Sequence, residues 1–205
     1  MRDVLLVLFV LASVLLAGCG SDQGSEADRM AEEHDGDTPV ATEGARAPAI
    51  PVEAEQVTYT QTAEGTAVRG YRARPANPDS ILEARGQDPS TASLPGLVVI
   101  HEWWGLNENV RTATRRLAGQ GYHALAVDVY QGKTASSPDS AQAYMQQAMS
   151  RPDRVRQNLQ DAHDHLRSEV NAPRVAVMGW CFGGGRTFDA VAAAPQQYDA
   201  AVAYY

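Results

Sequence analysis

Residues 179–183, with the sequence GWCFG, constrain the fold of this chain more than any other feature. They follow the apolar run at residues 175–178 and open a glycine-rich stretch. This is the G-x-S-x-G pattern of a sharp strand-to-helix turn, with cysteine in the place of serine, and the glycines relieve crowding around the presented side chain. The pattern predicts that Cys181 stands at a helix N-terminus, where partial positive charge favours the thiolate, the nucleophilic form of a thiol.

Strand and helix patterns alternate before and after this turn. Short apolar runs predict buried strands at residues 97–100, 124–127 and 175–178, with a last strand from about residue 200. Helical spacing predicts helices at residues 107–118, 140–149, 150–170 and 183–194, the first capped by Asn107 and the third by Ser150. Residues 56–60 and 66–71 predict a hairpin, and residues 77–93 a polar loop. We therefore expect an α/β fold: a doubly wound, mostly parallel sheet with an N-terminal antiparallel hairpin.

The N-terminus has the pattern of an export signal. Arg2 precedes an apolar run that is shorter than a spanning helix requires, and small residues then lead to Cys19. We interpret residues 1–18 as a lipoprotein signal peptide and Cys19 as the lipidated residue; an ordinary secretory signal is the alternative. The interpretation predicts a protein of the bacterial cell envelope, anchored to a membrane by lipid and facing the periplasm or the exterior.

The segment that follows is acidic. Residues 19–52 are rich in Gly, Pro, Ala and Glu and contain almost no large apolar side chain. Such a segment buries too little surface to offset the entropy of ordering, so we predict a disordered tether. Residues 53–205 then form a single domain, long enough to bury a sizeable core.

Charge and cysteine count narrow the range of partners. The net charge is −8 and no basic stripe occurs, which excludes nucleic acid as an expected partner. The chain has two cysteines, so lipidation of Cys19 would leave Cys181 without a disulfide partner. We find no nucleotide fingerprint, predict no metal site and no cofactor, and expect a monomer.

Three segments that contain polar, ionisable and aromatic side chains are expected at one edge of the sheet. They are residues 101–107 (HEWWGLN), residues 128–132 (DVYQG) and the turn at Cys181. Each follows a predicted parallel strand, and ligands of open α/β sheets bind outside the carboxyl ends of the strands. The topology alone therefore brings these segments together.

In this order and spacing, the three segments resemble the dienelactone hydrolase family, from about residue 57 to the end of the chain. Its members are α/β hydrolases with a Cys-His-Asp triad, and the named enzyme opens the lactone ring of dienelactones. The resemblance implies that Cys181 is the nucleophile, that Glu102 takes part in activating the thiol, and that a small ester or lactone is the substrate. It also implies an oxyanion hole made by the backbone N–H groups of Trp103 and Phe182. Trp104 and Tyr130 are expected to wall the substrate pocket.

Two departures from the family pattern bear on activity. The family's catalytic aspartate and histidine follow strands beyond the end of this sequence, whereas His101, His123, His163 and His165 all precede Cys181. We therefore expect a C-terminally incomplete chain that hydrolyses esters weakly or not at all. The prototype places an arginine two residues after its pocket tyrosine, where this chain has Gly132, which argues against the prototype's lactone specificity.

Structural roles are the alternatives for several of these residues. Cys181 could be an inert buried thiol, and Glu102 a solvated or salt-bridged carboxylate. We interpret His101 as a hydrogen-bonded structural residue at a strand end, Asp128 as a turn cap, and His163 and His165 as surface residues of a helix. At the level of function, the alternatives are a ligand-binding domain without catalysis and a thiol-redox domain, each anchored at the cell envelope.

Overall fold

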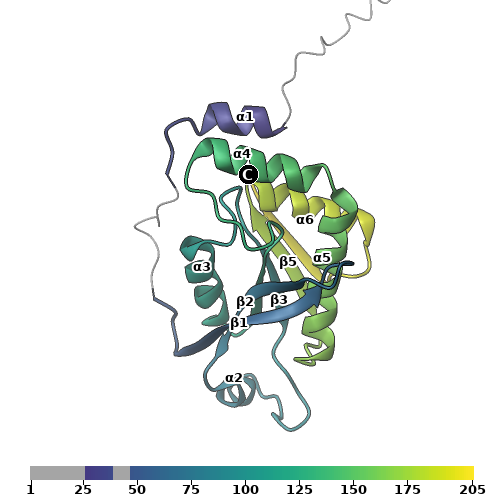
Figure 1. Cartoon of the computed structure of the whole chain (residues 1–205). Helices are drawn as coiled ribbons and strands as arrows, with labels where there is room; N and C mark the ends of the chain where they lie inside the picture. Colours follow the sequence, from purple (N-terminus) through teal and green to yellow (C-terminus); the bar gives the residue numbers. More distant parts are fainter. Residues whose placement is uncertain (1–25, 39–46) are drawn as a thin grey trace, which may run out of the picture.

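The structure of the chain, a computed structural model, describes residues 26–38 and 47–205 (Figure 1). The predicted signal peptide and Cys19 lie outside these residues. The centre of the molecule is a six-stranded sheet in the order β1-β2-β4-β3-β5-β6. The strands are β1 (Val52–Gln61), β2 (Ala67–Pro75), β3 (Gly96–Ile100), β4 (His123–Val127), β5 (Val175–Trp180) and β6 (Ala200–Tyr204).

The pairing confirms the predicted fold class. β1 and β2 form an antiparallel hairpin, and β2 joins β4 in antiparallel orientation. From β4 to β3, β5 and β6 all pairs are parallel, with helices in the connections. This is a doubly wound α/β sheet with an N-terminal antiparallel hairpin.

Helices cover both faces of the sheet. α3 contacts β2 and β4 on one face, while α5 and α6 contact the other face (Figure 1). The helices are α1 (Glu26–Glu33), α2 (Pro78–Ala84), α3 (Glu108–Ala118), α4 (Pro138–Met149), α5 (Pro152–Ser168) and α6 (Phe182–Ala193). None of the helices in the described parts of the chain combines the length and the apolar character that a bilayer span requires.

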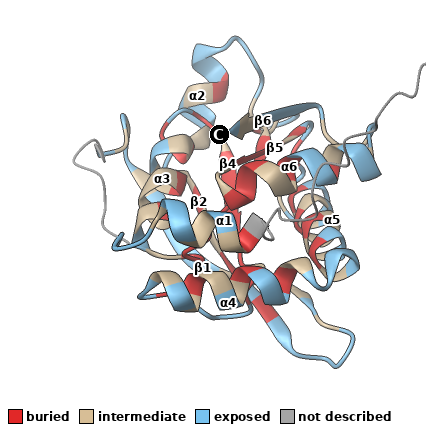
Figure 2. Ribbon diagram, turned by 90° about the horizontal axis from the view of Figure 1, so that it is seen from above, coloured by how far each residue is buried: buried red, intermediate tan, exposed pale blue. Residues whose placement is uncertain are grey.

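The buried residues of β3 show why the strand runs are continuously apolar. Leu97 and Val99 pack with Val110 beneath α3, whereas Val98 and Ile100 belong to the larger cluster formed with α5 and α6. Successive side chains of a strand point to opposite faces, so a strand covered on both faces is apolar at every position. Buried residues accordingly concentrate along the strands and the inner sides of the helices (Figure 2).

The register aligns the carboxyl ends of the parallel strands. Ile100 lies opposite Val127 of β4 and opposite Gly179 of β5, and Trp180 lies opposite Tyr204 of β6. The segments that follow β3, β4 and β5 therefore begin at the same edge of the sheet. This is the edge at which the sequence predicted the site.

Helix caps confirm one prediction and correct another. The Asn107 side chain accepts a hydrogen bond from the Val110 amide at 3.2 Å and caps α3, as predicted. The prediction that Ser150 caps α5 is wrong. Ser150 still belongs to the last turn of α4, where its hydroxyl donates to the Gln147 carbonyl at 2.9 Å, and α5 begins after Arg151. Two helices that follow each other so closely leave no separate capping position at Ser150.

Two segments contain helices that the sequence analysis did not predict. Within the expected loop at residues 77–93, α2 begins at an Asn77 cap and buries Leu82. Within the expected tether at residues 19–52, the structure contains α1, which packs against α4. Ala27, Met30 and Ala31 recur at helical spacing and contact the main core cluster. These small apolar side chains give the acidic segment a face that it can bury.

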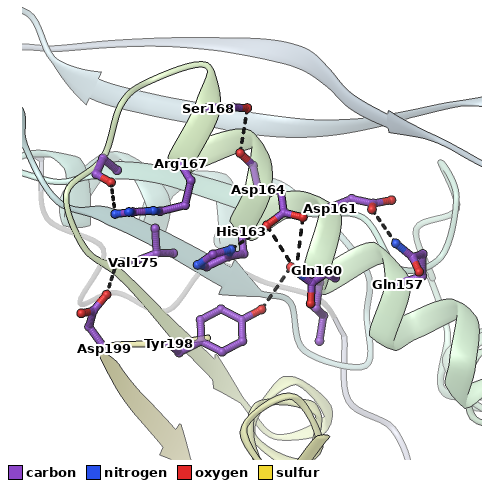
Figure 3. Close-up of polar contacts among 12 residues, drawn as sticks. Gln157, Gln160, Asp161, His163, Asp164, Arg167, Ser168, Val175, Tyr198 and Asp199 are labelled. Carbon is purple, nitrogen blue, oxygen red and sulfur yellow. Dashed lines mark hydrogen bonds and ion pairs between the residues drawn. The ribbon is translucent and has the colours of Figure 1, made fainter. Parts of the chain in front are cut away.

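Polar contacts fix α5 to the amino ends of β5 and β6 (Figure 3). The Asp199 carboxylate accepts from the Val175 amide at 2.8 Å, and the Tyr198 hydroxyl donates to the Leu159 carbonyl at 3.1 Å. Arg167 donates to two carbonyl oxygens of the loop after α5, at 2.6 and 2.5 Å. These contacts lie at the end of the sheet opposite the predicted site.

Candidate active site

Cys181 adopts the strained backbone conformation of a nucleophile elbow. β5 ends at Trp180, and Cys181 follows as the N-cap of α6 with φ 54° and ψ −122°. A positive φ is unfavourable for a residue with a β-carbon and persists only where the surrounding structure enforces it. The strain lies at the residue that the sequence pattern singled out.

The packing around the glycines of the pattern leaves no room for a side chain. A β-carbon on Gly179 would overlap the carbonyl oxygen of Gly183, and one on Gly183 would overlap the carbonyl oxygen of Ile100. The turn thus packs its backbone directly against the end of β3. The Cys181 amide donates to the Tyr204 carbonyl at 3.0 Å, and the Cys181 carbonyl accepts from the Gly185 amide at 3.1 Å. Hydrogen bonds therefore fix both the amide and the carbonyl of Cys181.

The start of α6 places partial positive charge beside Cys181. Cys181 is half-buried, and it precedes an α6 whose first turn contains no acidic residue, so the partial positive charge of the helix N-terminus is not neutralised. The hydroxyl groups of Tyr130 and Tyr205 lie close enough to interact with its charge. Burial first, and the charge of Cys181 second, raise the pKa of Tyr130 above its ordinary value.

Glu102 lies next to this cluster. It follows β3 in the loop at residues 101–107, and its side chain accepts a hydrogen bond from the Tyr205 hydroxyl. Burial raises the pKa of Glu102, and the Tyr205 hydrogen bond and the charge of His34 oppose that rise. Tyr205 therefore connects the two groups, because it interacts with both Glu102 and Cys181.

Two backbone N–H groups are available beside the elbow. Phe182 is the first residue of α6, and the N–H groups of a first helical turn have no acceptor within the helix. Among residues 26–38 and 47–205, no backbone carbonyl accepts from the N–H of Trp103 or of Phe182. Both residues have buried side chains that fix the loop and the helix start.

His101 and Asp128 have the structural roles that we predicted for them. The His101 ring is fully buried; its Nδ1 donates to the Glu102 carbonyl at 2.6 Å, and its Nε2 accepts from the Val129 amide at 3.4 Å. With both nitrogens engaged, burial lowers the pKa of His101. The Asp128 carboxylate accepts from the amides of Tyr130 and Gly132 at 2.9 and 2.5 Å and so caps the turn after β4.

The two predicted pocket residues, Trp104 and Tyr130, have different surroundings in the structure. Trp104 packs in the core, with its ring 5.0 Å from that of Trp103 in a T-shaped arrangement. Tyr130 is also buried, with its ring 4.5 Å from His101 and 5.5 Å from Phe182. Its hydroxyl has no hydrogen-bond partner among the described residues.

A cavity of about 670 Å³ opens beside Tyr130. It lies between the β1–β2 turn, the end of β4 and the helices α4 and α5, and neither Trp104 nor Cys181 lines it. Its apolar lining includes Val68, Tyr130, Tyr144 and Val155, and its polar lining includes Arg151 and Arg154. Tyr130 belongs both to this cavity and to the surroundings of the elbow, so it joins the two.

The structure brings one residue to the site that the sequence analysis missed. His34 follows α1, and its ring lies 5.3 Å from the Trp103 ring, within electrostatic reach of Glu102. Its Nδ1 is 2.7 Å from the Asp37 carboxylate. The sequence signal was a His and an Asp three positions apart, hidden in a segment whose composition indicated disorder.

The remaining histidines lie away from the elbow. His163 and His165 are on α5, where the His163 ring contacts Asp164 and Tyr198 (Figure 3). His123 begins β4, at the other end of the sheet. No group of His, Cys, Asp or Glu with the arrangement of a metal site occurs within the part of the chain that the structure describes.

Comparisons with known proteins agree with this geometry. A family model described as "Dienelactone hydrolase family" matches residues 82–205. "Protein usf" of Aquifex pyrophilus is 35% identical over 117 residues, which cover 54% of this chain and 51% of that protein. The "Putative carboxymethylenebutenolidase" of Escherichia coli K12 is 32% identical over 157 residues, covering 72% of this chain and 56% of that protein.

Solved structures are also similar to this chain. The dienelactone hydrolase-like promiscuous phosphotriesterase P91, from metagenomic libraries, has a TM-score of 0.59 at 28% identity and covers 75% of this chain and 59% of that one. Brefeldin A esterase, at 17% identity and a TM-score of 0.51, is similar in fold alone. The chain spans about half the length of the curated relatives that it matches.

Proposed function

This chain belongs to the dienelactone hydrolase family, and on that premise we propose that it cleaves a carboxylic ester or lactone through an acyl-enzyme on Cys181. The observation that carries the proposal is the elbow itself. A non-glycine residue with positive φ, flanked by glycines that the packing requires, stands at the start of a helix at the carboxyl edge of the sheet. A thiol that served only to fill the core would not need this strained backbone.

Acylation follows from the groups around the elbow. Glu102 takes the thiol proton, and burial makes its carboxylate more basic by raising its pKa. The Cys181 sulfur attacks the substrate carbonyl, and the resulting oxyanion accepts hydrogen bonds from the N–H groups of Trp103 and Phe182. The tetrahedral intermediate collapses, the alkoxide leaves with the proton held by Glu102, and a thioester remains on Cys181.

The substrate is a small ester or lactone. The cavity beside Tyr130 offers room for the part of the molecule that does not react, and both apolar and polar side chains line it. The position of the prototype's carboxylate-binding arginine is occupied by Gly132, so we propose a substrate range different from that of the prototype.

The location of the protein is a proposal that rests on sequence alone. We infer that Cys19 carries an acyl anchor and holds the protein at a bacterial envelope membrane. Expression of the whole chain in a bacterium, followed by fractionation, tests this: Cys19→Ala should move the protein from the membrane fraction to the soluble fraction. Wild-type protein in the soluble fraction would contradict it.

The catalytic proposal is tested with p-nitrophenyl acetate. The wild-type chain should release a burst of nitrophenol and gain one acetyl group, detected by mass spectrometry of the intact protein. Cys181→Ala should lose both signals, whereas Cys19→Ala, at the only other cysteine, should keep them. Equal burst amplitudes in the wild type and in Cys181→Ala would refute the proposal and favour a ligand-binding or thiol-redox domain.

A further inference from the structure

The cavity beside Tyr130 has the size of a small-molecule site. Its volume is about 670 Å³, and it lies between the β1–β2 turn, the end of β4 and the helices α4 and α5. Cavities of roughly 300–1,000 Å³ bury most of the surface of a small organic ligand. Cys181 does not line this cavity, so binding there does not require a reaction at the thiol.

Burial divides the lining of the cavity into two kinds of side chain. The buried members are apolar or aromatic, among them Val68, Tyr130 and Val155, each at most 7% exposed. The exposed members are mostly polar and include Glu64 and Arg151. Apolar walls that hold the body of a ligand, with a few polar groups that orient it, are typical of small-molecule sites. We therefore expect a ligand with an apolar body and one polar end.

Positive charge is in excess on one side of the cavity. The Arg154 guanidinium lies 3.7 Å from the Glu64 carboxylate, and Arg151 interacts with the charge of the same carboxylate. Within the described residues, the Arg151 guanidinium forms no ion pair or hydrogen bond of its own. Lys133 adds a third cation nearby, since its Nζ donates at 2.8 Å to the side chain of Gln147, which lines the cavity. Three cations thus accompany one carboxylate.

The other two carboxylates of the lining already have partners. Asp153 forms an ion pair with Arg156. Asp161 accepts from the Thr60 hydroxyl at 2.5 Å and from the Gln157 side-chain amide at 2.7 Å. A cationic ligand would have to compete with these partners, whereas an anionic group can meet the Arg151 guanidinium without breaking a contact. The charges therefore favour an anionic end on the ligand.

We propose that this cavity is a binding site for an apolar carboxylate. Its carboxylate pairs with Arg151, and its apolar body packs against Val68, Tyr144 and Val155. The planar guanidinium of arginine matches the two oxygens of a carboxylate in geometry as well as in charge. The inference goes beyond the proposed reaction, because this binding needs no acyl-enzyme.

The test compares a charged probe with its neutral analogue. The full chain is titrated with 4-phenylbutanoate and with 4-phenylbutanamide, and binding is followed by ligand-observed NMR. The wild type should bind the acid about fivefold more tightly than the amide at low ionic strength, the effect of one exposed ion pair. Arg151→Gln should abolish this difference and leave the affinity for the amide unchanged. Ala148→Leu adds bulk at a buried position of the lining and should weaken both probes, with its melting temperature measured to confirm folding.

Arg174→Gln is the matched control. It removes the same charge at an exposed position just before β5, at the opposite end of the sheet, and should keep the wild-type preference for the acid. Equal affinity of the wild type for acid and amide, or a preference that persists in Arg151→Gln, would overturn the proposal.

The same measurements keep this site separate from the chemistry at the elbow. Cys181→Ala should bind 4-phenylbutanoate as tightly as the wild type does. A chain that binds the acid in this way but gives no acetyl burst would refute the acyl-enzyme and leave the carboxylate site standing. A chain that gives the burst but binds neither probe would overturn the carboxylate site alone.

Discussion

At the scale of single residues, the elbow and the turn after β4 contain two different kinds of glycine constraint. Gly183 has an ordinary backbone conformation, but a β-carbon there would overlap the carbonyl oxygens of Ile100 and His101. Gly132 has a φ of +86° and open space around it. The first position is limited by packing against backbone that cannot move, and the second only by the left-handed conformation.

These two positions make a matched pair of alanine variants. We expect Gly183→Ala to lower the free energy of unfolding by about 3 kcal/mol, because the β-carbon forces α6 away from β3. Gly132→Ala should cost about 1 kcal/mol, the strain of a positive φ alone. Urea unfolding followed by tryptophan fluorescence measures both. Equal losses in the two variants would show that the close approach of α6 to β3 is not the constraint.

At the scale of elements, the sequence predicted the parts whose burial is complete. β3, β4 and β5 are apolar because both faces of each strand are covered, so each carries a continuous apolar run in its sequence. The places of Cys181 and Glu102 followed from strand order, since segments after parallel strands share one edge. α1 was missed because its buried face consists of small or single apolar residues in an acidic segment. Contacts with α4 stabilise it, and pairing of this kind is not visible in local composition.

His34 escaped prediction for the same reason. Its relation to Trp103 and Glu102 spans the distance from the N-terminal segment to the middle of the chain. No periodicity or motif connects these residues. The position of Trp104 outside the cavity lining was equally hidden, because the pattern HEWWGLN does not indicate that both tryptophan side chains are buried in the core.

β6 presents an apolar edge. Within the described residues it pairs only with β5, and Val202 is 44% and Tyr204 47% exposed; on the neighbouring α6, Phe188 is 71% exposed. An unpaired strand edge with apolar side chains is a site of self-association. We therefore expect the 205-residue chain to associate as its concentration rises, although the sequence alone led us to expect a monomer.

Substitution of Val202 by lysine should reduce this association, because a charge on an edge strand opposes pairing with another copy. Size-exclusion chromatography with light scattering, at several protein concentrations, measures the effect. Gln87→Lys adds the same charge at an exposed position far along the chain and should leave the apparent mass unchanged. If both variants behave alike, net charge and not the β6 edge governs the association.

At the scale of the whole molecule, buried histidines set the response to acid. Burial lowers the pKa of His101, His123 and His165 in the folded state. For His123, burial together with the charges of Arg74 and Arg72 lowers the pKa to about 4, and its Nδ1 is buried without a hydrogen-bond partner among the described residues. The unfolded chain has histidines with an ordinary pKa near 6.5. As pH falls below this value, the unfolded state therefore binds protons before the folded state does.

The stability of the fold should consequently be highest above about pH 7 and decline between about pH 6.5 and pH 4. His123 alone contributes a loss of about 3 kcal/mol across this window, since each unit of pKa difference corresponds to about 1.4 kcal/mol. Glu102, whose pKa burial raises, acts in the opposite direction, because its folded form binds a proton more readily than its unfolded form does.

Urea midpoints measured at pH 7.5 and pH 4.5 test the sign of this pH dependence. His123→Asn should flatten the dependence, because asparagine fills part of the same space without titrating. A stability that rises on acidification would show that the buried histidines gain protons inside the fold, and would contradict the neutral state that their surroundings impose.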